Sequence, residues 1–339
     1  MVAHTMEKSD HNQFITLRET PDDHAVDFVP RTFSDYLGQE ALKEKLQLYT
    51  QAAKMRNEAL DHLLLFGPPG LGKTTLATIM AQVMNVGIKI CSGPMMERTG
   101  DLVAILSGLE PRDILFIDEI HRMPIAVEEV LYSAMEHFRV DVIIGQGAGA
   151  KSVNLPISPF TLVGATTKSG MISAPLRSRF GITERLDYYE DKDLAAIVMQ
   201  TARFLAITID QNAALAIAQC ARGTPRIAKK IMRRVRDIAQ VNNYAIIDLP
   251  CVTKALQFLG LDGEGLTKID HAIIRIIMEQ FNGGPVGLET LACMVGEDAQ
   301  TIENVYEPFL MRTGYIEKTA RGRQIPHKRL QLLGQKAVF

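Results

Sequence analysis

The stretch LLLFGPPGLGKTT, residues 63–75, decides the fold class of this chain. It contains GPPGLGKT, residues 67–74, which matches the pattern G-x-x-x-x-G-K-[ST] between an apolar run of strand length and a helical pattern. Its glycines let backbone N–H groups wrap a phosphate chain, Lys73 reaches the β and γ phosphates, and the Thr74 hydroxyl ligates Mg²⁺. The motif and its context predict a phosphate-binding loop rather than an accidental Gly-rich turn.

The run DILFIDEIH, residues 113–121, is an apolar strand that ends in two adjacent carboxylates, Asp118 and Glu119. Two acids at a strand end are usually a solvated turn, but a doubly buried strand ends in them when a charged ligand lies at its carboxyl end. There Asp118 can hold the Mg²⁺ shell, and Glu119 can polarise the attacking water. Downstream of a phosphate loop, the pair therefore favours hydrolysis of ATP over binding alone.

Three further polar motifs carry weaker signals. The strand TLVGATT ends in Thr166 and Thr167, whose hydroxyls can bond the γ-phosphate or its water, although Thr is also common in strands. APLRSRFG holds Arg177 and Arg179, and two arginines in such a stretch are most often surface charges. GTPRIAKK places Arg226 at the first turn of a helix, where a cation opposes the helix dipole unless an anion is near. Arg226 therefore favours a phosphate partner.

Apolar runs of strand length alternate with helical patterns over residues 38–186. The strand candidates are 63–66, 88–91, 114–117 and 161–164, and the helical candidates are 73–84 and 126–136. Strands that are apolar throughout and alternate with helices imply a parallel sheet covered on both faces. The fold class is therefore α/β.

The segment VDVIIGQGAGAKSVNLP, residues 140–156, breaks this rhythm and predicts a hairpin inserted into the α/β domain. It is either an ornament of the sheet edge or a docking surface for a partner. Docking is favoured because the hairpin has more apolar side chains than it can bury against itself. These side chains are Val142, Ile143, Ile144, Val153 and Leu155.

The rest of the chain predicts helices and a second hairpin. Helical patterns at 193–205, 212–221 and 225–241 indicate a small all-helical domain, and LGLDGEGL at 259–266 indicates a linker. Helical patterns at 270–281, 288–295 and 299–311 are followed by a strand-like pair around TARGRQ. Three short helices followed by a hairpin are typical of the winged helix-turn-helix.

The composition is that of an ordinary globular protein, because 47% of the 339 residues are apolar and 22% are charged. No apolar run is long enough to span a bilayer and the N-terminus lacks the apolar core of a signal peptide, so we expect a cytoplasmic protein without membrane contact. The four cysteines are far apart in sequence and are expected to be buried, reduced thiols. The net charge is −2, yet residues 312–339 carry seven basic residues against one acid, an excess that can attract a polyanion.

In this order, the motifs resemble those of the RuvB family of AAA+ ATPases, the bacterial motors of Holliday-junction branch migration. The resemblance runs from about Phe28 to the C-terminus and rests on GPPGLGKTTLA, DILFIDEIHR, PFTLVGATT, PLRSRFG, RGTPRIA, GGPVGL, YEPFL, RTG and RGR. It implies a flexible arm at 1–27, a large AAA+ ATPase domain at 28–187, a small helical lid at 188–262 and a winged-helix DNA-binding domain at 263–339. The implied cofactors are ATP and Mg²⁺.

The resemblance also implies a role for each matching position. Thr167, helped by Thr166, would be the first sensor, and Arg226 the second sensor in cis. Arg179 would be the finger that enters the ATP site of the neighbouring subunit, while Tyr36 and Leu37 would lie near adenine. The implied catalytic set is Lys73, Asp118, Glu119, Thr167 and Arg179, with Thr74 and Asp118 on the metal. The implied nucleotide contacts are Val29, Tyr36, Leu37, Gly67, Gly70, Gly72, Lys73, Thr74, Thr75, Tyr189 and Arg226.

The implied partners are double-stranded DNA at four-way junctions, a RuvA-like junction-binding protein at the hairpin 140–156, a junction resolvase and further copies of the chain in a hexameric ring. On the wing, Lys318, Arg321 and Arg323 would bind backbone phosphates, which suits a motor that moves along any sequence. A solvated basic surface on a protein-interaction winged helix is the alternative.

The sequence departs from the family pattern at Val29, Lys168 and Lys318, where arginine is usual, and RGR is followed by QIP. A lysine keeps a phosphate contact but loses the bidentate fork of arginine. We predict a three-domain AAA+ ATPase that forms a ring around double-stranded DNA and drives branch migration. The alternatives are a clamp-loader-like or initiator-like ATP switch acting on DNA, and a non-motor interaction protein; a protein unfoldase is disfavoured because no aromatic pore loop stands out.

Overall fold

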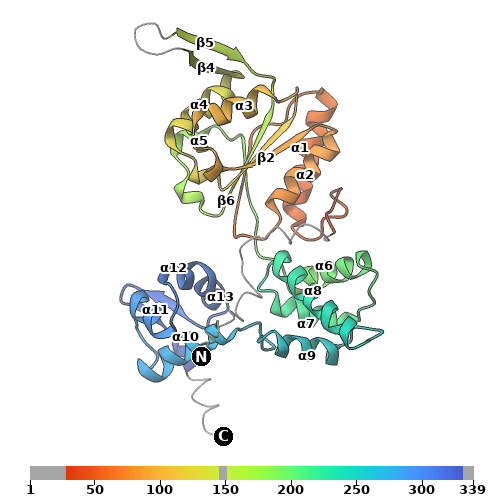
Figure 1. Ribbon diagram of the computed structural model, residues 1–339, viewed down its shortest axis with the longest axis vertical. Coiled ribbons are helices and arrows are strands. Elements are labelled where there is room, and N and C mark those ends of the chain that lie inside the picture. The colour runs from red at the N-terminus through yellow and green to blue at the C-terminus, as the bar shows by residue number, and fades with distance from the viewer. Residues whose placement is uncertain (1–27, 145–150, 331–339) are drawn as a thin grey trace, which may run out of the picture. The chain divides into compact units, whose positions relative to one another are not determined.

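The computed structural model describes residues 28–144 and 151–330. They form two compact units, residues 28–193 with Thr224–Arg226, and residues 194–223 with residues 227–330 (Figure 1). Each unit has its own hydrophobic core. The expected N-terminal arm, the tip of the first hairpin and the end of the basic tail lie outside the described residues.

The first unit is built on a five-stranded parallel sheet with the strand order β2-β3-β6-β1-β7. Its strands are β1 (Leu63–Phe66), β2 (Ile88–Ser92), β3 (Ile114–Asp118), β6 (Thr161–Thr166) and β7 (Ile182–Arg185). The first four confirm the strands expected from apolar runs. The sequence of β7, ITER, does not predict a strand, because this edge strand is only half-buried and its side chains alternate.

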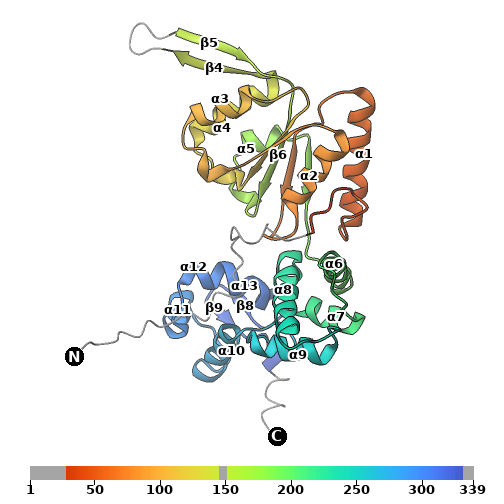
Figure 2. The ribbon, with the colours of Figure 1, turned by 45° about the vertical axis from the view of Figure 1, so that its right-hand side comes forward.

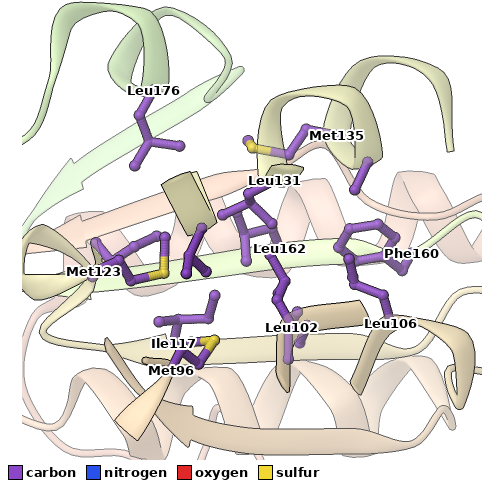
Figure 3. Packing of buried hydrophobic residues seen from close by; sticks show 14 of the residues in the cluster. Met96, Leu102, Leu106, Ile117, Met123, Leu131, Met135, Phe160, Leu162 and Leu176 are labelled. Atoms are coloured by element: carbon purple, nitrogen blue, oxygen red, sulfur yellow. The ribbon is translucent and has the colours of Figure 1, made fainter. Parts of the chain in front are cut away.

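Helices cover both faces of this sheet (Figures 1 and 2). One face carries α1 (Glu40–Arg56) and α2 (Lys73–Met84), and the other carries α3 (Thr99–Ser107), α4 (Ile125–His137) and α5 (Ala174–Ser178). Figure 3 shows the core on the second face, where side chains of α3 and α4 meet those of β3 and β6; they include Leu102, Leu106, Leu131, Ile117 and Leu162. Burial of each such side chain contributes about 1.5–3 kcal/mol, so this core anchors both helices to the sheet.

The register of the sheet brings three strand ends together. Phe66 of β1 pairs with Thr166 of β6, and Ile117 of β3 pairs with Gly164 of β6. The phosphate-loop motif follows Phe66, the two acids follow Ile117, and the threonine pair ends β6. Because the carboxyl ends of parallel strands share one edge, the three motifs meet there.

The predicted hairpin at 140–156 is confirmed as β4 (Arg139–Ile144) and β5 (Lys151–Pro156). The two strands are antiparallel, and Val142 pairs with Val153. In Figures 1 and 2 the hairpin extends away from the helices and sheet of the first unit. It is therefore an arm of this unit and not a strand added to the central sheet.

The second unit combines a helical part with a winged helix. The helical part has α6 (Asp191–Phe204), α7 (Gln211–Cys220), α8 (Pro225–Val241) and α9 (Leu249–Phe258). The winged helix has α10 (Lys268–Gln280), α11 (Leu288–Val295), α12 (Ala299–Thr301), the π-helical turn η7 (Ile302–Tyr306), α13 (Glu307–Arg312), β8 (Glu317–Thr319) and β9 (Gly322–Gln324). The single helix expected at 299–311 contains the π turn, because Pro308 lacks the N–H that continuous α-helical bonding needs.

The expected linker at 259–266 is packed into this unit. Arg222, which follows α7, donates through Nε to the carbonyl of Gly265 at 3.1 Å and forms an ion pair with Asp270 of α10. Its guanidinium also lies over the ring of Phe309, 4.4 Å from the centroid. Asp270 is fully buried, so these contacts join the helical part firmly to the winged helix.

The thiols follow the expectation in part. Cys220 and Cys251 are buried, Cys91 is half-buried, and all four cysteines are free. Cys293 is exposed, which corrects the expectation of a buried thiol: it lies on the outer face of α11, opposite the buried Leu291 and Ala292. Within residues 28–144 and 151–330, no helix is long and apolar enough to cross a membrane.

Candidate active site

The phosphate loop has the backbone that its glycines allow. Gly67, Gly70 and Gly72 have φ values of 146°, 78° and 99°. A Cβ on Gly72 would lie 2.8 Å from the Tyr36 hydroxyl, and one on Gly67 would lie 2.4 Å from the carbonyl oxygen of Leu186. Both conformation and space therefore exclude a side chain at Gly67 and Gly72.

Lys73 opens α2 and is buried at the loop. Its Nζ donates to the carbonyl oxygens of Gly67 and Pro68, both at 2.9 Å. Burial lowers the pKa of Lys73, against the opposing fields of Asp118 and Glu119. The structure thus brings together the lysine and the two acids that the motifs predict. Thr74 and Thr75 follow Lys73 in the first turn of α2, and both are half-buried.

Asp118 ends β3, and several opposing interactions act on the pKa of its carboxylate. Burial raises its pKa, and the neighbouring charge of Glu119 acts in the same direction. The backbone N–H of Glu119 donates to Asp118 Oδ1 at 3.0 Å, and Lys73 also lowers the pKa. A half-buried carboxylate of this kind is stabilised in its charged form by a cation.

Glu119 begins a sharp turn after β3. Its backbone is left-handed, with φ 48° and ψ 45°, a conformation rarely found outside turns and functional sites. The Thr167 hydroxyl lies 3.1 Å and 3.2 Å from its two carboxylate oxygens. His121 Nδ1 lies 3.1 Å from Glu119 Oε2 and 2.8 Å from the hydroxyl of Thr166. The expected water-polarising acid and first sensor are thus in contact.

Thr74 and Asp118 fit the Mg²⁺ that the motifs predict. Mg²⁺ takes oxygen ligands and is usually bound by one or two carboxylates, substrate phosphates and water rather than by a full protein cage. The half-buried Asp118 carboxylate and the half-buried Thr74 hydroxyl supply such oxygens. Across the described residues, no group of three or more His, Cys, Asp or Glu side chains could hold a metal by itself.

Two tyrosines join the loop to the segment before α1. The hydroxyl of Tyr189 donates to the hydroxyl of Tyr36 at 2.8 Å, and both hydroxyls lie close to the carbonyl oxygen of Leu71, at 3.2 Å and 3.1 Å. Burial raises the pKa of both tyrosines, so they remain neutral. Leu37 is half-buried beside them, whereas Val29 is 52% exposed.

Arg226, the predicted second sensor, reaches the loop. Its backbone N–H lies 3.4 Å from the carbonyl oxygen of Gly70, and a Cβ on Gly70 would lie 3.1 Å from the Cβ of Arg226. Burial lowers the pKa of its guanidinium. The first turn of α8 is therefore in contact with the phosphate loop.

Three family models cover the described chain in sequence. The Holliday junction DNA helicase RuvB P-loop domain matches residues 28–186, the RuvB AAA lid domain matches residues 189–262, and the RuvB C-terminal winged helix domain matches residues 263–334. The chain belongs to the RuvB family.

RuvB relatives match most of the chain. The Holliday junction branch migration complex subunit RuvB of Lactococcus lactis subsp. lactis (strain IL1403) is 52% identical over 305 residues, which are 90% of this chain and 92% of that protein. The subunit of the same name from Staphylococcus haemolyticus (strain JCSC1435) is 54% identical over 295 residues, covering 87% and 89%. The solved Thermotoga maritima RuvB Holliday junction branch migration motor is 47% identical, with a TM-score of 0.79 over 90% of this chain and 98% of that one.

Arg179, the expected finger of this RuvB family member, follows α5 directly, and its side chain packs against α4. Its Nη2 is 3.2 Å from Glu136 Oε1, and its Nη1 donates to the carbonyl oxygen of Pro175 at 2.7 Å. The guanidinium also lies over the ring of Tyr132, 4.4 Å from the centroid. Arg177, the other arginine of the motif, is exposed and donates to the carbonyl oxygen of Ser169.

The hairpin of this RuvB chain shows an exposed apolar side chain. Val153 on β5 is 44% exposed, and its neighbour Asn154 donates to Asp141 Oδ1 at 2.8 Å across the hairpin. Leu155 is half-buried. The side chains of Val142, Ile143 and Ile144 are outside the description, so the docking surface stays a prediction.

The three wing cations are placed differently. Lys318 is about half exposed and pairs with Glu303 at 3.1 Å, and Arg321 is exposed at the turn between β8 and β9. Arg323 is buried, and its Nε and Nη2 donate to the two carboxylate oxygens of the fully buried Glu307 at 2.6 Å and 3.2 Å. Its guanidinium lies inside the winged helix, which does not match the predicted phosphate contact, whereas Lys318 and Arg321 are accessible.

Sequence patterns did not single out three residues at this site. His121 contacts Glu119 and Thr166, while Tyr132 and Glu136 contact Arg179. His121 lies in the quoted DEIH run, and only the left-handed turn at Glu119 brings it back to the acid. Tyr132 and Glu136 are four residues apart and so share one face of α4, but which face lies against Arg179 is a tertiary property.

Proposed function

We propose that this chain is the ATP-driven motor subunit of a branch-migration complex, which moves double-stranded DNA at four-way junctions in recombination and repair. The observation that carries the proposal is the meeting of Lys73, Asp118 and the Glu119–Thr167 pair at one edge of the sheet, in a chain of the RuvB family. This arrangement has the parts that phosphoryl transfer needs, a cation for the phosphates and an acid for the water.

In the proposed reaction, Lys73 leaves the carbonyls of its own loop and balances the charge of the β and γ phosphates of ATP. Glu119 orients the attacking water and accepts its proton. Thr167 exchanges its bond to Glu119 for one to the γ-phosphate or the water, so the acid and the sensor respond together. Thr74 and Asp118 would hold Mg²⁺, which would neutralise part of the phosphate charge.

The active site is completed by a neighbouring subunit. Arg179 holds Glu136 and Tyr132 of its own chain, and in the proposal it releases Glu136 to reach the ATP of the next subunit. A finger in trans makes hydrolysis depend on assembly, and the ring we propose is a hexamer. Arg226 acts in cis, because its helix turn contacts the loop of its own chain.

DNA and protein partners occupy separate surfaces of the proposed motor. The wing offers Lys318 and Arg321 to backbone phosphates, without base readout. A RuvA-like junction-binding protein docks on the hairpin of β4 and β5, where Val153 is exposed. A junction resolvase acts on the same junctions, and the complex works in the cytoplasm with the DNA.

The test is branch migration of a synthetic four-way junction with Mg²⁺ and ATP, with and without a RuvA protein. We expect the parent to dissociate the junction only with ATP, and Lys73→Ala and Arg179→Ala to lose this activity. Arg177→Ala, in the same motif but exposed, is the matched control and is expected to behave as the parent.

An ATP-hydrolysing parent that leaves the junction intact, with and without the partner, would overturn the motor. A single ATP-dependent assembly event on DNA would then favour a clamp-loader-like switch. ATP hydrolysis that is indifferent to DNA would favour a non-motor interaction protein.

A further inference from the structure

His121 lies between the acid and the threonine pair of the site. It belongs to the short helical turn η4 (Ile120–Arg122), and only 5% of its side chain is exposed. Its Nδ1 is 3.1 Å from Glu119 Oε2 and 2.8 Å from the hydroxyl of Thr166. One ring nitrogen thus touches the carboxylate at the end of β3 and a hydroxyl at the end of β6.

The hydrogen of the imidazole can be assigned. Burial lowers the pKa of His121 against the opposing charges of Glu119 and Asp118, and Lys168 and Arg122 also lower it, so the ring is neutral and carries one N–H. An ionised Glu119 carboxylate can only accept, so the N–H that faces it is on Nδ1. The Thr166 hydroxyl already accepts the backbone N–H of Lys168 at 3.0 Å, and with this assignment Nδ1–H of His121 donates to it at 2.8 Å and faces Glu119 Oε2 at 3.1 Å.

Side-chain groups from two different elements therefore contact the Glu119 carboxylate. The Thr167 hydroxyl after β6 donates to it, and Nδ1 of His121 on η4 lies 3.1 Å from its Oε2. The terminal torsion of a glutamate is broad, so a carboxylate held by one donor can still rotate. A second donor from another direction removes this rotation, and a general base works only from the correct orientation.

We propose that His121 is a positioning residue for ATP hydrolysis: its Nδ1–H holds the Glu119 carboxylate in the orientation from which it accepts the proton of the attacking water. The residue acts through Glu119, so the proposal rests on the role given to Glu119 above. The competing explanation is that His121 only ties η4 to β6 through Thr166, in which case it affects folding and not the chemical step.

Three substitutions of His121 separate these explanations. The amide nitrogen of Asn is attached to Cγ, as Nδ1 of His is, so His121→Asn keeps the donor near its place. His121→Leu removes it, and His121→Gln moves it one bond further out, to the place of Nε2. His137, exposed at the end of α4, supplies the matched control His137→Leu.

We expect His121→Leu and His121→Gln to lower kcat roughly 10- to 100-fold, by analogy with the loss found when a side chain that orients a metal ligand is removed. KM for ATP, nucleotide binding and Tm should stay close to those of the parent. His121→Asn should recover most of kcat, and His137→Leu should equal the parent. Should His121→Leu not fold, the polar pair His121→Gln and His121→Asn makes the same comparison.

A double-mutant cycle with Glu119→Gln completes the test. If His121 acts through Glu119, His121→Leu has no further effect on kcat once Glu119→Gln is present. The proposal is overturned if His121→Leu and His121→Gln hydrolyse ATP like the parent, if His121→Asn is as impaired as they are, or if the losses in the double variant add. Parental turnover in Glu119→Gln alone would instead refute the role of Glu119 in the proposed function.

Discussion

Two buried cations, Lys73 in the phosphate loop and Arg323 on the wing, have opposite surroundings. Lys73 donates to the carbonyl oxygens of Gly67 and Pro68, and burial lowers its pKa. Arg323 instead makes a bidentate ion pair with the fully buried Glu307. A buried cation without a close ion pair is stabilised when an anionic ligand binds, so it indicates a binding site. A buried cation in a bidentate ion pair is already compensated, and its role is in the fold.

Arg179 lies between these two cases, because it is paired with Glu136 yet is expected to work in the neighbouring subunit. We expect Arg179→Ala to lower ATP turnover by about 10³- to 10⁵-fold, since a finger stabilises the charge of the transition state. Nucleotide binding should persist, and steady-state kinetics with binding by a fluorescent ATP analogue measure both.

Mixing Arg179→Ala with Glu119→Gln subunits tests whether the finger acts in trans. Some interfaces of a mixed ring combine an intact finger with an intact acid, so part of the turnover should return. No recovery in mixtures that form rings would contradict a finger in trans.

Arg323→Ala should destabilise the winged helix by about 3–5 kcal/mol, because Glu307 is left as a buried, unpaired carboxylate. The denaturant midpoint of the intact chain measures the loss. Glu307→Gln in the same background removes the stranded charge and should restore part of the stability. If Arg323→Ala kept parental stability and lost only DNA affinity, Arg323 would be a phosphate contact and the contrast with Lys73 would fail.

Lys73→Ala should lower turnover and leave stability intact, the opposite of the stability loss expected for Arg323→Ala. The loss of one positioned charge donor is expected to lower turnover about 10²- to 10³-fold. Stability should change little or rise, because a buried cation that burial disfavours is removed. ATP turnover and the thermal midpoint of unfolding, measured on the same preparation, test both expectations. A large drop in the thermal midpoint would assign Lys73 a structural role.

Arg321→Ala should have the smallest effect. Arg321 is exposed at the turn of the wing, so stability should not change measurably. DNA affinity should fall for all sequences alike, and the slope of log affinity against log salt should decrease by about 1. Binding to duplexes of different sequence over a salt series measures this, and Arg312→Ala, on α13 outside the hairpin, serves for comparison.

The edge of the sheet where the phosphate loop, the two acids and the threonine pair meet could be predicted closely from the sequence. The strand residues before Gly67 and Asp118 are all apolar, and the polar motifs follow them directly. Parallel packing then places these motifs at one edge whatever the rest of the chain does. The edge strand β7 was not expected because its half-exposed sequence lacks that continuous apolar run. The helices α1, α3 and α9 were not expected either, because a helix is indicated by a 3.6-residue period and not by such a run.

The sequence alone determined the α/β class, the phosphate loop, the Asp118–Glu119 pair and the winged helix, since each depends on local pattern and spacing. Only the tertiary structure decided which charged groups meet. It turned Arg323 inward onto Glu307, packed the segment 259–266 through Arg222, and brought His121 back onto Glu119. These contacts join residues through turns, helix faces and burial, and no spacing along the chain specifies the direction in which such a side chain points.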